Sequence, residues 1–207
     1  MNSRVMGIIL AGGQSSRMGA EKALLSLSGK PLIAHVAARL APQVALLAIN
    51  ANGNHARFAA LDLPVIADRP PAVASAGPLA GIVAGLAFAR DAGMGWLATA
   101  AADMPFLPRD LVSRLVAVAD AETLVCLAEG KRGLEPLCAL WRVAALPLLE
   151  AAEASGERSV HRIALAMSHR IARFAHSEPD AFLNLNTPAE FAAAEALLLG
   201  ADVWPQG

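Results

Sequence analysis

The sequence predicts an α/β fold of three layers, in which helices cover both faces of a doubly wound, mostly parallel β-sheet. Apolar runs of strand length recur along the chain and mostly do not alternate with polar residues, which is typical of strands buried on both faces of a parallel sheet. Segments with apolar residues at helical spacing separate these runs, and this alternation favours right-handed crossovers with helices on both faces. Alanine supplies much of the 56% hydrophobic content and favours closely packed helices.

Five apolar runs have the length and composition of buried strands. They are VMGIIL (5–10), VALLAI (44–49), PVIA (64–67), WLATAAA (96–102) and TLVCLA (123–128). Later in the chain, EPLCALW (135–141) and RIARF (170–174) are expected to add strands at the edge of the sheet. Ligands of doubly wound sheets bind beyond the carboxyl ends of the strands, so the residues that follow each run are the first candidates for a site.

Helical spacing of apolar residues predicts four helices between and after these runs. They fall within residues 31–41, 77–93, 107–121 and 187–200. Pro31 and Pro78 stand where the first turn of a helix accepts proline. Thr187, followed three residues later by Glu190, has the pattern of a capping box and predicts the start of the last helix.

Length and charge restrict the class of protein. A chain of 207 residues is long enough for one domain with a well-buried core, and we expect a single domain over 1–207. Only 17% of the residues are charged, which is far from the composition of a disordered chain. The net charge is −1 and the basic residues are scattered, which speaks against nucleic acid as a partner.

Cysteine usage and hydropathy point to a cytoplasmic protein without a membrane segment. Cys126 and Cys138 lie in apolar stretches, and we expect buried, reduced thiols, typical of the cytoplasm. The apolar segment near the N-terminus is too short for a secretory signal. No charge interrupts residues 70–89, but their prolines, glycines and alanines make a poor membrane span and predict a loop leading into a buried helix.

The loop after the first predicted strand has the features of a phosphate cradle. Residues 7–22 read GIILAGGQSSRMGAEK, and successive glycines let backbone N–H groups point at one anion. The spacing fits neither the Walker A loop nor the dinucleotide-binding fingerprint. Arg17 and Lys22 are the cations that such a loop would use, unless both are ordinary solvated residues of a loop and first turn.

Polar residues follow three other predicted strands. Asp103 stands after a strand of small residues, and its carboxylate is a candidate ligand of Mg²⁺ beside a bound triphosphate. Taken alone, Asp103 is better explained as a turn-forming residue in the segment before proline. Asn50 and Asp68 also come directly after strands, on the same edge of a parallel sheet, although polar turn residues are common there.

The segment LNLNTP (183–188) places Asn184 and Asn186 two residues apart, hence on one face of an extended chain, where they could bind a substrate or a metal-bound water. None of the five histidines pairs with a nucleophile signature, so a hydrolytic triad has no support. A phosphate cradle, two cations and one metal-type carboxylate are the minimal set for phosphoryl or nucleotidyl transfer by positioning and electrostatics.

These motifs resemble the nucleotidyltransferases that begin Leu-Ala-Gly-Gly-x-Ser-x-Arg-Met-Gly-x-Asp-Lys, and most closely the MobA-type molybdenum cofactor guanylyltransferases. The corresponding residues here are 10–22, and GPLAG (77–81), DMPFLP (103–108), EPLCALW (135–141) and NLNTP (184–188) match in the same order. The pair Gly12-Gly13 resembles the Gly-Gly that guanylyltransferases typically carry at this position, where related cytidylyltransferases carry Ala-Gly. Glu21 departs from the pattern, in which Asp precedes the lysine.

The resemblance implies a Rossmann-like nucleotide-diphospho-sugar transferase fold, Mg²⁺ as cofactor, and transfer of GMP from GTP to the terminal phosphate of molybdopterin with release of pyrophosphate. The residues implied to bind the nucleotide are Leu10, Ala11, Gly12, Gly13, Lys22, Asn50, Asp68 and Asp103. Arg17, Lys22 and Asp103 are the implied catalytic residues, with Asp103 holding the metal. Asn184 and Asn186 are implied to lie near the pterin of the acceptor.

Two alternatives remain open at this point. One is a sister enzyme on the same scaffold that uses CTP or another small phosphorylated acceptor. The other is a non-catalytic carrier of nucleotide or cofactor. The presence of Lys22 and Asp103 argues against a carrier, because a pure binding protein has little need of a carboxylate that binds a metal. The implied partners are GTP, the molybdenum cofactor and its precursor, other proteins of cofactor biosynthesis, and molybdoenzyme chaperones.

Overall fold

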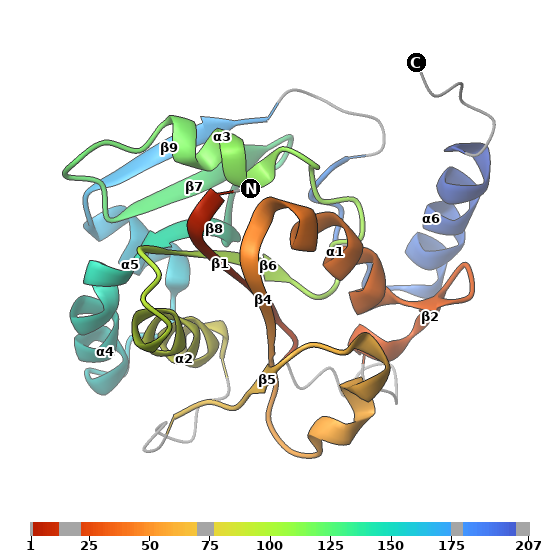
Figure 1. The fold of residues 1–207 in the computed structure, drawn as a ribbon. Coiled ribbons are helices and arrows are strands. Elements are labelled where there is room, and N and C mark those ends of the chain that lie inside the picture. Colours follow the sequence, from red (N-terminus) through yellow and green to blue (C-terminus); the bar gives the residue numbers. More distant parts are fainter. Residues whose placement is uncertain (1, 13–21, 70–76, 175–179, 202–207) are drawn as a thin grey trace.

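A seven-stranded β-sheet runs through the middle of the protein (Figure 1). The computed structural model describes residues 2–12, 22–69, 77–174 and 180–201. In spatial order the strands of this sheet are β5 (Val65–Ile66), β4 (Val44–Asn50), β1 (Asn2–Leu10), β6 (Trp96–Ala101), β8 (Gly133–Arg142), β7 (Val125–Gly130) and β9 (His169–Arg173). A separate two-stranded sheet pairs β2 (Ser26–Leu27) with β3 (Lys30–Pro31).

The sheet is mostly parallel, as predicted. Strands β5, β4, β1 and β6 pair in parallel, and so do β7 and β9. Only β8 runs against its neighbours β6 and β7 within the described sheet. The placement of β8 corrects the expectation that both later strands lie at the edge: β9 does, but β8 lies inside the sheet. The turn of Lys131 and Arg132 joins β7 directly to β8 and pairs them antiparallel, which leaves the other side of β8 for β6.

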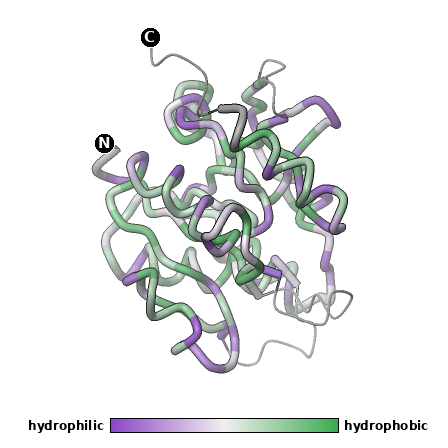
Figure 2. The backbone as a smooth tube through the Cα atoms, turned by 90° about the vertical axis from the view of Figure 1, so that its right-hand side faces the viewer, coloured by the Kyte–Doolittle hydropathy of each residue, from purple (hydrophilic) through white to green (hydrophobic). Residues whose placement is uncertain are grey.

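The described helices lie on both faces of the sheet, which confirms the three layers. They are α1 (Leu32–Leu40), α2 (Pro78–Asp91), α3 (Leu111–Ala117), α4 (Leu146–Ala154), α5 (Val160–Ala166) and α6 (Pro188–Ala201). Alternate residues of β1 face opposite cores: Val5 and Ile9 pack with α1 and α3, whereas Met6 and Ile8 pack with α2, α4 and α5. In Figure 2, green hydrophobic stretches run through the middle of the molecule and purple ones lie mainly at its periphery.

Helix starts follow the predicted signals with one shift. Pro78 is the first residue of α2, whereas Pro31 lies one position before α1 and closes β3. The capping box of α6 is formed: the Glu190 amide donates to Thr187 Oγ1 at 3.2 Å, and the Thr187 amide donates to the Glu190 carboxylate at 2.8 Å. Helices α4 and α5 were not among the predicted helices.

Helix α6 lies apart from the two main cores and closes a third, smaller one. Leu27 of β2, Leu32 of α1, Phe106 and Leu185 meet Ala194 of α6 there. Figure 1 shows α6 beside the β2 hairpin, on the other side of the molecule from β9. This packing carries the chain that precedes α6 back across the carboxyl ends of the strands, where the candidate site lies.

Both cysteines are buried and free, as expected. Burial raises the pKa of the Cys126 thiol to about 11 and raises that of Cys138 further. Both thiols are therefore protonated at neutral pH and unreactive. Over the stretches that the structure describes, no helix is both long and apolar enough to cross a membrane. Of the apolar segment 70–89, residues 70–76 lie outside the described residues, and the rest forms most of α2.

Candidate active site

The carboxyl ends of β1, β4, β5 and β6 meet at one edge of the sheet. The chain leaves β1 toward β4 and leaves β6 in the opposite direction, toward β7 and β8, so the switch point of the sheet lies between β1 and β6. Backbone bonds continue past the strand ends: the Ala11 amide donates to Asn50 O at 2.9 Å, and the Ala102 amide donates to Leu10 O at 3.1 Å. The residues after the strands are thus held in fixed positions.

Four predicted side chains converge at this switch point. Lys22, which follows the glycine-rich loop, directs its Nζ at the carboxylate of Asp103 in a short ion pair. The same Nζ donates to Asn184 Oδ1 at 2.9 Å and to Asn186 Oδ1 at 2.6 Å. The side chains of Lys22 and Asp103 are only 13% and 20% exposed, so the pair is screened from water far more than a surface salt bridge. We call these four residues the lysine centre.

The segment before α6 aims both asparagines at the lysine centre. The Leu185 amide donates to the carbonyl of Asp103 at 3.1 Å, which joins this segment to the end of β6. Leu185 is fully buried, and alternation along an extended chain therefore puts its two neighbours on the other face. The backbone amides of Asn186 and Thr187 donate to Glu190 and hold the pKa of that carboxyl below its ordinary value.

A second group of predicted residues lies at the ends of β4 and β5. Asn50 is 3% exposed, and its Nδ2 donates to Asp68 Oδ1 at 2.9 Å and to the carbonyl of Ile66 at 3.2 Å. Asn52 Nδ2 donates to Asp68 Oδ2 at 2.7 Å, and the amide of Asp68 donates back to Asn52 Oδ1 at 2.9 Å. We call Asn50, Asn52 and Asp68 the asparagine–aspartate group.

Gly81 makes room for Asn50, and Gly12 lies beside the same side chain. A Cβ at Gly81, in the first half of α2, would lie 2.2 Å from Asn50 Oδ1, which no real contact allows. A Cβ at Gly12 would lie 3.4 Å from the same oxygen. Leu10 and Ala11 are buried between the two polar groups, so the end of β1 separates the lysine centre from the asparagine–aspartate group.

The structure thus gathers most of the predicted site residues into two neighbouring groups at one edge. Gly13, Arg17 and Glu21 lie outside the described residues. Sequence reasoning missed Asn52 and Gly81 as site residues. Asn52 stands two residues after Asn50 and could have been found by alternation, whereas the need for glycine at position 81 depends on a contact with β4 that is distant in sequence.

The lysine centre has oxygen donors that suit a hard divalent cation. One carboxylate oxygen and two amide oxygens surround Lys22 Nζ, and Mg²⁺ prefers one or two carboxylates completed by phosphate oxygens and water. Among the residues that the structure describes, no group of three or more His, Cys, Asp or Glu could hold a metal by itself. The donor set therefore fits Mg²⁺ as a metal shared with a phosphate ligand.

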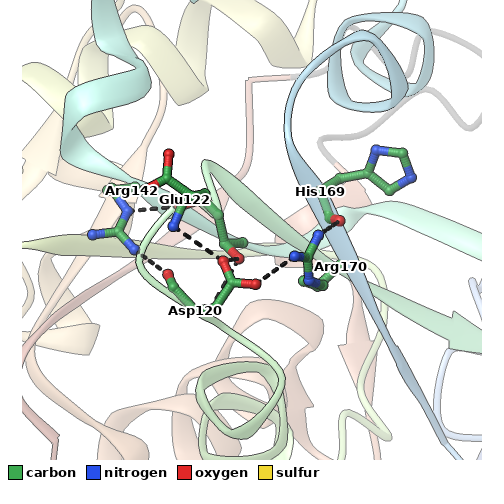
Figure 3. Close-up of polar contacts among 6 residues, drawn as sticks. Asp120, Glu122, Arg142, His169 and Arg170 are labelled. Carbon is green, nitrogen blue, oxygen red and sulfur yellow. Dashed lines mark hydrogen bonds and ion pairs between the residues drawn. The ribbon is translucent and has the colours of Figure 1, made fainter.

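Another polar cluster lies at the opposite edge of the sheet (Figure 3). Arg170 donates to the Asp120 carboxylate in a short ion pair, and Arg142 donates to the Asp120 carbonyl at 2.6 Å. The hydroxyl of Thr123, above all, lowers the pKa of Asp120. These contacts tie the chain before β7 to β8 and β9, and they are satisfied within the cluster, so we assign them to stability.

Comparison with known proteins agrees with this geometry. The sequence matches the family described as "MobA-like NTP transferase domain" over residues 7–172. It is 50% identical over 192 residues to the molybdenum cofactor guanylyltransferase of Rhodobacter capsulatus, covering 93% of this chain and 95% of that protein. It is 47% identical over 196 residues to the protein of that name from Cereibacter sphaeroides, covering 94% and 97%.

Solved structures share the fold. The molybdopterin-guanine dinucleotide biosynthesis protein A of Archaeoglobus fulgidus has a TM-score of 0.74 at 24% identity, covering 94% of this chain and 99% of that one. A CMP:2-keto-3-deoxy-manno-octonic acid synthetase complexed with CTP has a TM-score of 0.71 at 17% identity, covering 96% and 100%. At these identities the structural likeness shows the fold alone. The sequence match over residues 7–172 and the close relatives show that this chain belongs to the MobA-like NTP transferase family.

Proposed function

We propose that this protein transfers GMP from GTP to the terminal phosphate of molybdopterin. The observation that carries the proposal is the lysine centre, where Lys22, Asp103, Asn184 and Asn186 converge at the switch point from segments far apart in sequence. A relative that is 50% identical bears the name molybdenum cofactor guanylyltransferase, and this similarity supports guanine as the base and the molybdenum cofactor as the destination.

The proposed reaction exchanges one phosphoanhydride bond for another. A terminal phosphate oxygen of the acceptor attacks the α-phosphorus of GTP, the new P–O–P bond forms, and the bond from the α-phosphorus to the bridging oxygen breaks, so that pyrophosphate leaves. The attacking phosphate is already ionised at neutral pH, so the protein needs no general base for it. Its task is to hold the two phosphates in line and to offset the charge on the leaving group.

Lys22 is the described residue best placed for that task. Its ammonium is shielded from water by its position, so its attraction for a phosphate is stronger than at an open surface. Arg17, outside the described residues, is proposed as a second cation on the phosphates. The three oxygens that now surround Lys22 Nζ compete with a phosphate for the same ammonium, so we expect Lys22 to exchange them for phosphate oxygens when GTP binds.

We propose Mg²⁺ as the cofactor, held by Asp103 with Asn184 and Asn186 as further oxygen donors. When bound, the metal would act as a Lewis acid and offset the charge that develops on the phosphates. When Lys22 turns from these oxygens to a phosphate, the oxygens of Asp103, Asn184 and Asn186 become available to such a cation. The family resemblance implies that the same asparagines lie near the pterin, so we also propose them as contacts of the acceptor substrate.

Purified protein with Mg²⁺ and molybdopterin, supplied with either GTP or CTP, tests the proposal. We expect release of pyrophosphate and a dinucleotide product with GTP. Turnover with CTP alone would replace guanylyl transfer by cytidylyl transfer, which remains the alternative on this scaffold. Binding of GTP without any pyrophosphate release would favour a carrier of nucleotide or cofactor.

The compartment and partners are proposed on narrower grounds. Two buried, free thiols suit a reducing cytoplasm. The product is a cofactor that a molybdoenzyme must receive, so proteins of cofactor biosynthesis and molybdoenzyme chaperones are the proposed protein partners. Co-purification of the product with such a chaperone, from cells that make both proteins, would test this.

A further inference from the structure

We propose that Asn52 is a positioning residue, which fixes the carboxylate of Asp68 so that it receives a pair of hydrogen-bond donors from the nucleoside part of the bound nucleotide. The proposal rests on the proposed function, because it assumes that a nucleoside triphosphate binds at this edge of the sheet. Asn52 itself acts through Asp68.

The first step is the two-point contact between Asn52 and Asp68. Asn52 Nδ2 donates to Asp68 Oδ2 at 2.7 Å, and Asn52 Oδ1 accepts from the amide of Asp68 at 2.9 Å. Asn50 Nδ2 donates to the other carboxylate oxygen, Oδ1, at 2.9 Å. One amide donor on each oxygen fixes both the position and the plane of the carboxylate.

The second step is the acceptor capacity that remains. A carboxylate oxygen has about two acceptor directions, and each oxygen of Asp68 accepts one side-chain bond in the structure. Two acceptors therefore remain side by side, which fits two adjacent donors of a ligand. The base edge of guanine offers N1–H beside its 2-amino group, and ribose offers two neighbouring hydroxyls. Cytosine places an acceptor, N3, beside its amino group. The two acceptors of the Asp68 carboxylate therefore disfavour cytosine as a ligand.

The third step is the charge around Asp68, which favours the nucleoside over the phosphates as its ligand. The pKa of Glu153 in α4 is raised, first by burial and next by the negative charge of the nearby Asp68, and Glu150 adds to the effect. Arg69 pairs with Glu150 at 3.3 Å, at an exposed position. Phosphates are repelled by neighbouring carboxylates, whereas the neutral base and ribose are not.

The fourth step is the turn that holds Asn52. Arg57 donates to the carbonyls of Asn52 and Asn54, both at 2.7 Å, and its guanidinium lies over the ring of the buried Phe58 at 4.8 Å. Gly53 has φ +80°, which suits glycine and closes the turn. The backbone of Asn52 is thus fixed although its side chain is exposed, and a fixed residue can orient Asp68 without loss of conformational entropy on binding.

The experiment compares Asn52→Ala with the unaltered protein and with Asn54→Ala as matched control. Asn54 is in the same turn and caps the following 3₁₀ helix through the amide of Ala56, but the structure shows no hydrogen bond between Asn54 and Asp68. Binding of GTP, ITP and 2′-deoxyGTP in the presence of Mg²⁺ is measured by calorimetry, and thermal unfolding of each variant is recorded. ITP lacks the 2-amino group, and 2′-deoxyGTP lacks one ribose hydroxyl.

We expect the unaltered protein to prefer GTP over one of the two analogues. Asn52→Ala should bind GTP roughly tenfold more weakly, from the loss of a hydrogen bond to a charged group, and should lose that preference. Loss of the preference over ITP identifies the base edge as the ligand of Asp68, and loss of the preference over 2′-deoxyGTP identifies the ribose.

Two results would overturn the inference while leaving the proposed function intact. One is that Asn52→Ala binds GTP with the same affinity as the unaltered protein and as Asn54→Ala. The other is that it binds all three nucleotides equally more weakly, which a general disturbance of the turn would explain. Failure of the unaltered protein to bind GTP would instead refute the proposed function, and this inference with it.

Discussion

The contact between Gly81 and Asn50 makes the replacement Gly81→Ala a sensitive test of the site. In an ordinary helix, alanine in place of glycine stabilises by about 1 kcal/mol. Here the new Cβ would lie 2.2 Å from Asn50 Oδ1, 2.8 Å from its Cγ and 3.0 Å from Leu10 Cδ2, whereas ordinary contact begins at 3.4 Å. The shortfall for the oxygen is 3.4 − 2.2 = 1.2 Å, so Asn50 or α2 has to move.

The expected cost follows from what that movement breaks. Overpacking of a buried site costs about 1–3 kcal/mol. Displacement of Asn50 also weakens its bonds to Asp68 and to the Ile66 carbonyl, at about 1 kcal/mol each. Against the helical gain of about 1 kcal/mol, we expect Gly81→Ala to lower the free energy of unfolding by about 2–4 kcal/mol.

Urea denaturation of four proteins measures this: the unaltered chain, Gly81→Ala, Asn50→Ala and the double variant. Asn50→Ala removes the oxygen that the new Cβ meets, so Gly81→Ala should destabilise the Asn50→Ala variant much less than it destabilises the unaltered chain. We expect the two effects on the free energy of unfolding to differ from additivity by about 1–3 kcal/mol. If Gly81→Ala is as stable as the unaltered chain, or if the two costs simply add, the close contact does not exist and the reasoning is refuted.

Four further predictions concern other parts of the molecule. Asp103→Asn should keep the fold, checked by circular dichroism, but slow pyrophosphate release by about a hundredfold or more; undiminished release would remove Asp103 from the active site. Thr187→Ala should cost about 1 kcal/mol in urea denaturation, through loss of the cap of α6, and an unchanged midpoint would contradict the capping role. Because Asp120 has a lowered pKa when folded, its charge contributes stability above its ordinary pKa, and this is lost as pH falls through the lowered value. The stability difference between the unaltered chain and Asp120→Asn should therefore shrink below about pH 4; a difference that grows there would reverse the assigned sign. Cys126 and Cys138 should resist alkylation at pH 8 until denaturant is added, as mass spectrometry can show, whereas rapid labelling of the native protein would contradict their burial.

Much of the fold could be predicted from the sequence because its signals are local. The apolar runs that became β1, β4 and β6 show their burial by composition alone, and the capping box at Thr187 shows the start of α6 within four residues. Helix α5 was missed although Ser159 caps it through the Arg162 amide at 3.2 Å. Its seven residues are too few for a clear helical period.

The order of the later strands could not be predicted in the same way. Strand-like composition in EPLCALW says that β8 is buried, but not which strands it pairs with. That depends on the short turn between Gly130 and Gly133, which pairs β8 with β7, and on the free side that β6 offers. Strand pairing joins residues distant in sequence, so it leaves little trace in any one window.

The same distinction separates the predicted from the missed parts of the candidate site. Lys22 was predicted as a cation of the glycine-rich loop, and Asp103 as a carboxylate directly after a strand, beside that loop. The contact of Lys22 with Asn184 and Asn186 joins segments 162 and 164 residues apart. The spacing of the two asparagines and the family resemblance both marked them as candidates, but neither predicted this contact. Asn52 has an exposed side chain in a turn, where polar residues are common, and only its bonds to Asp68 set it apart.

The order of the strands orients the proposed reaction. Along the sheet, β5 and β4 carry the asparagine–aspartate group, β1 carries the short apolar segment 10–12, and β6 carries Asp103 of the lysine centre. A nucleoside triphosphate with its nucleoside on Asp68 and its phosphates on Lys22 therefore lies across the end of β1. The side beyond β1 toward β5 is then taken by the nucleoside. Asn184 and Asn186 face Lys22 from the β6 side and are proposed both as donors to the metal and as contacts of the acceptor, so the proposed acceptor site and the proposed metal site share the same two asparagines.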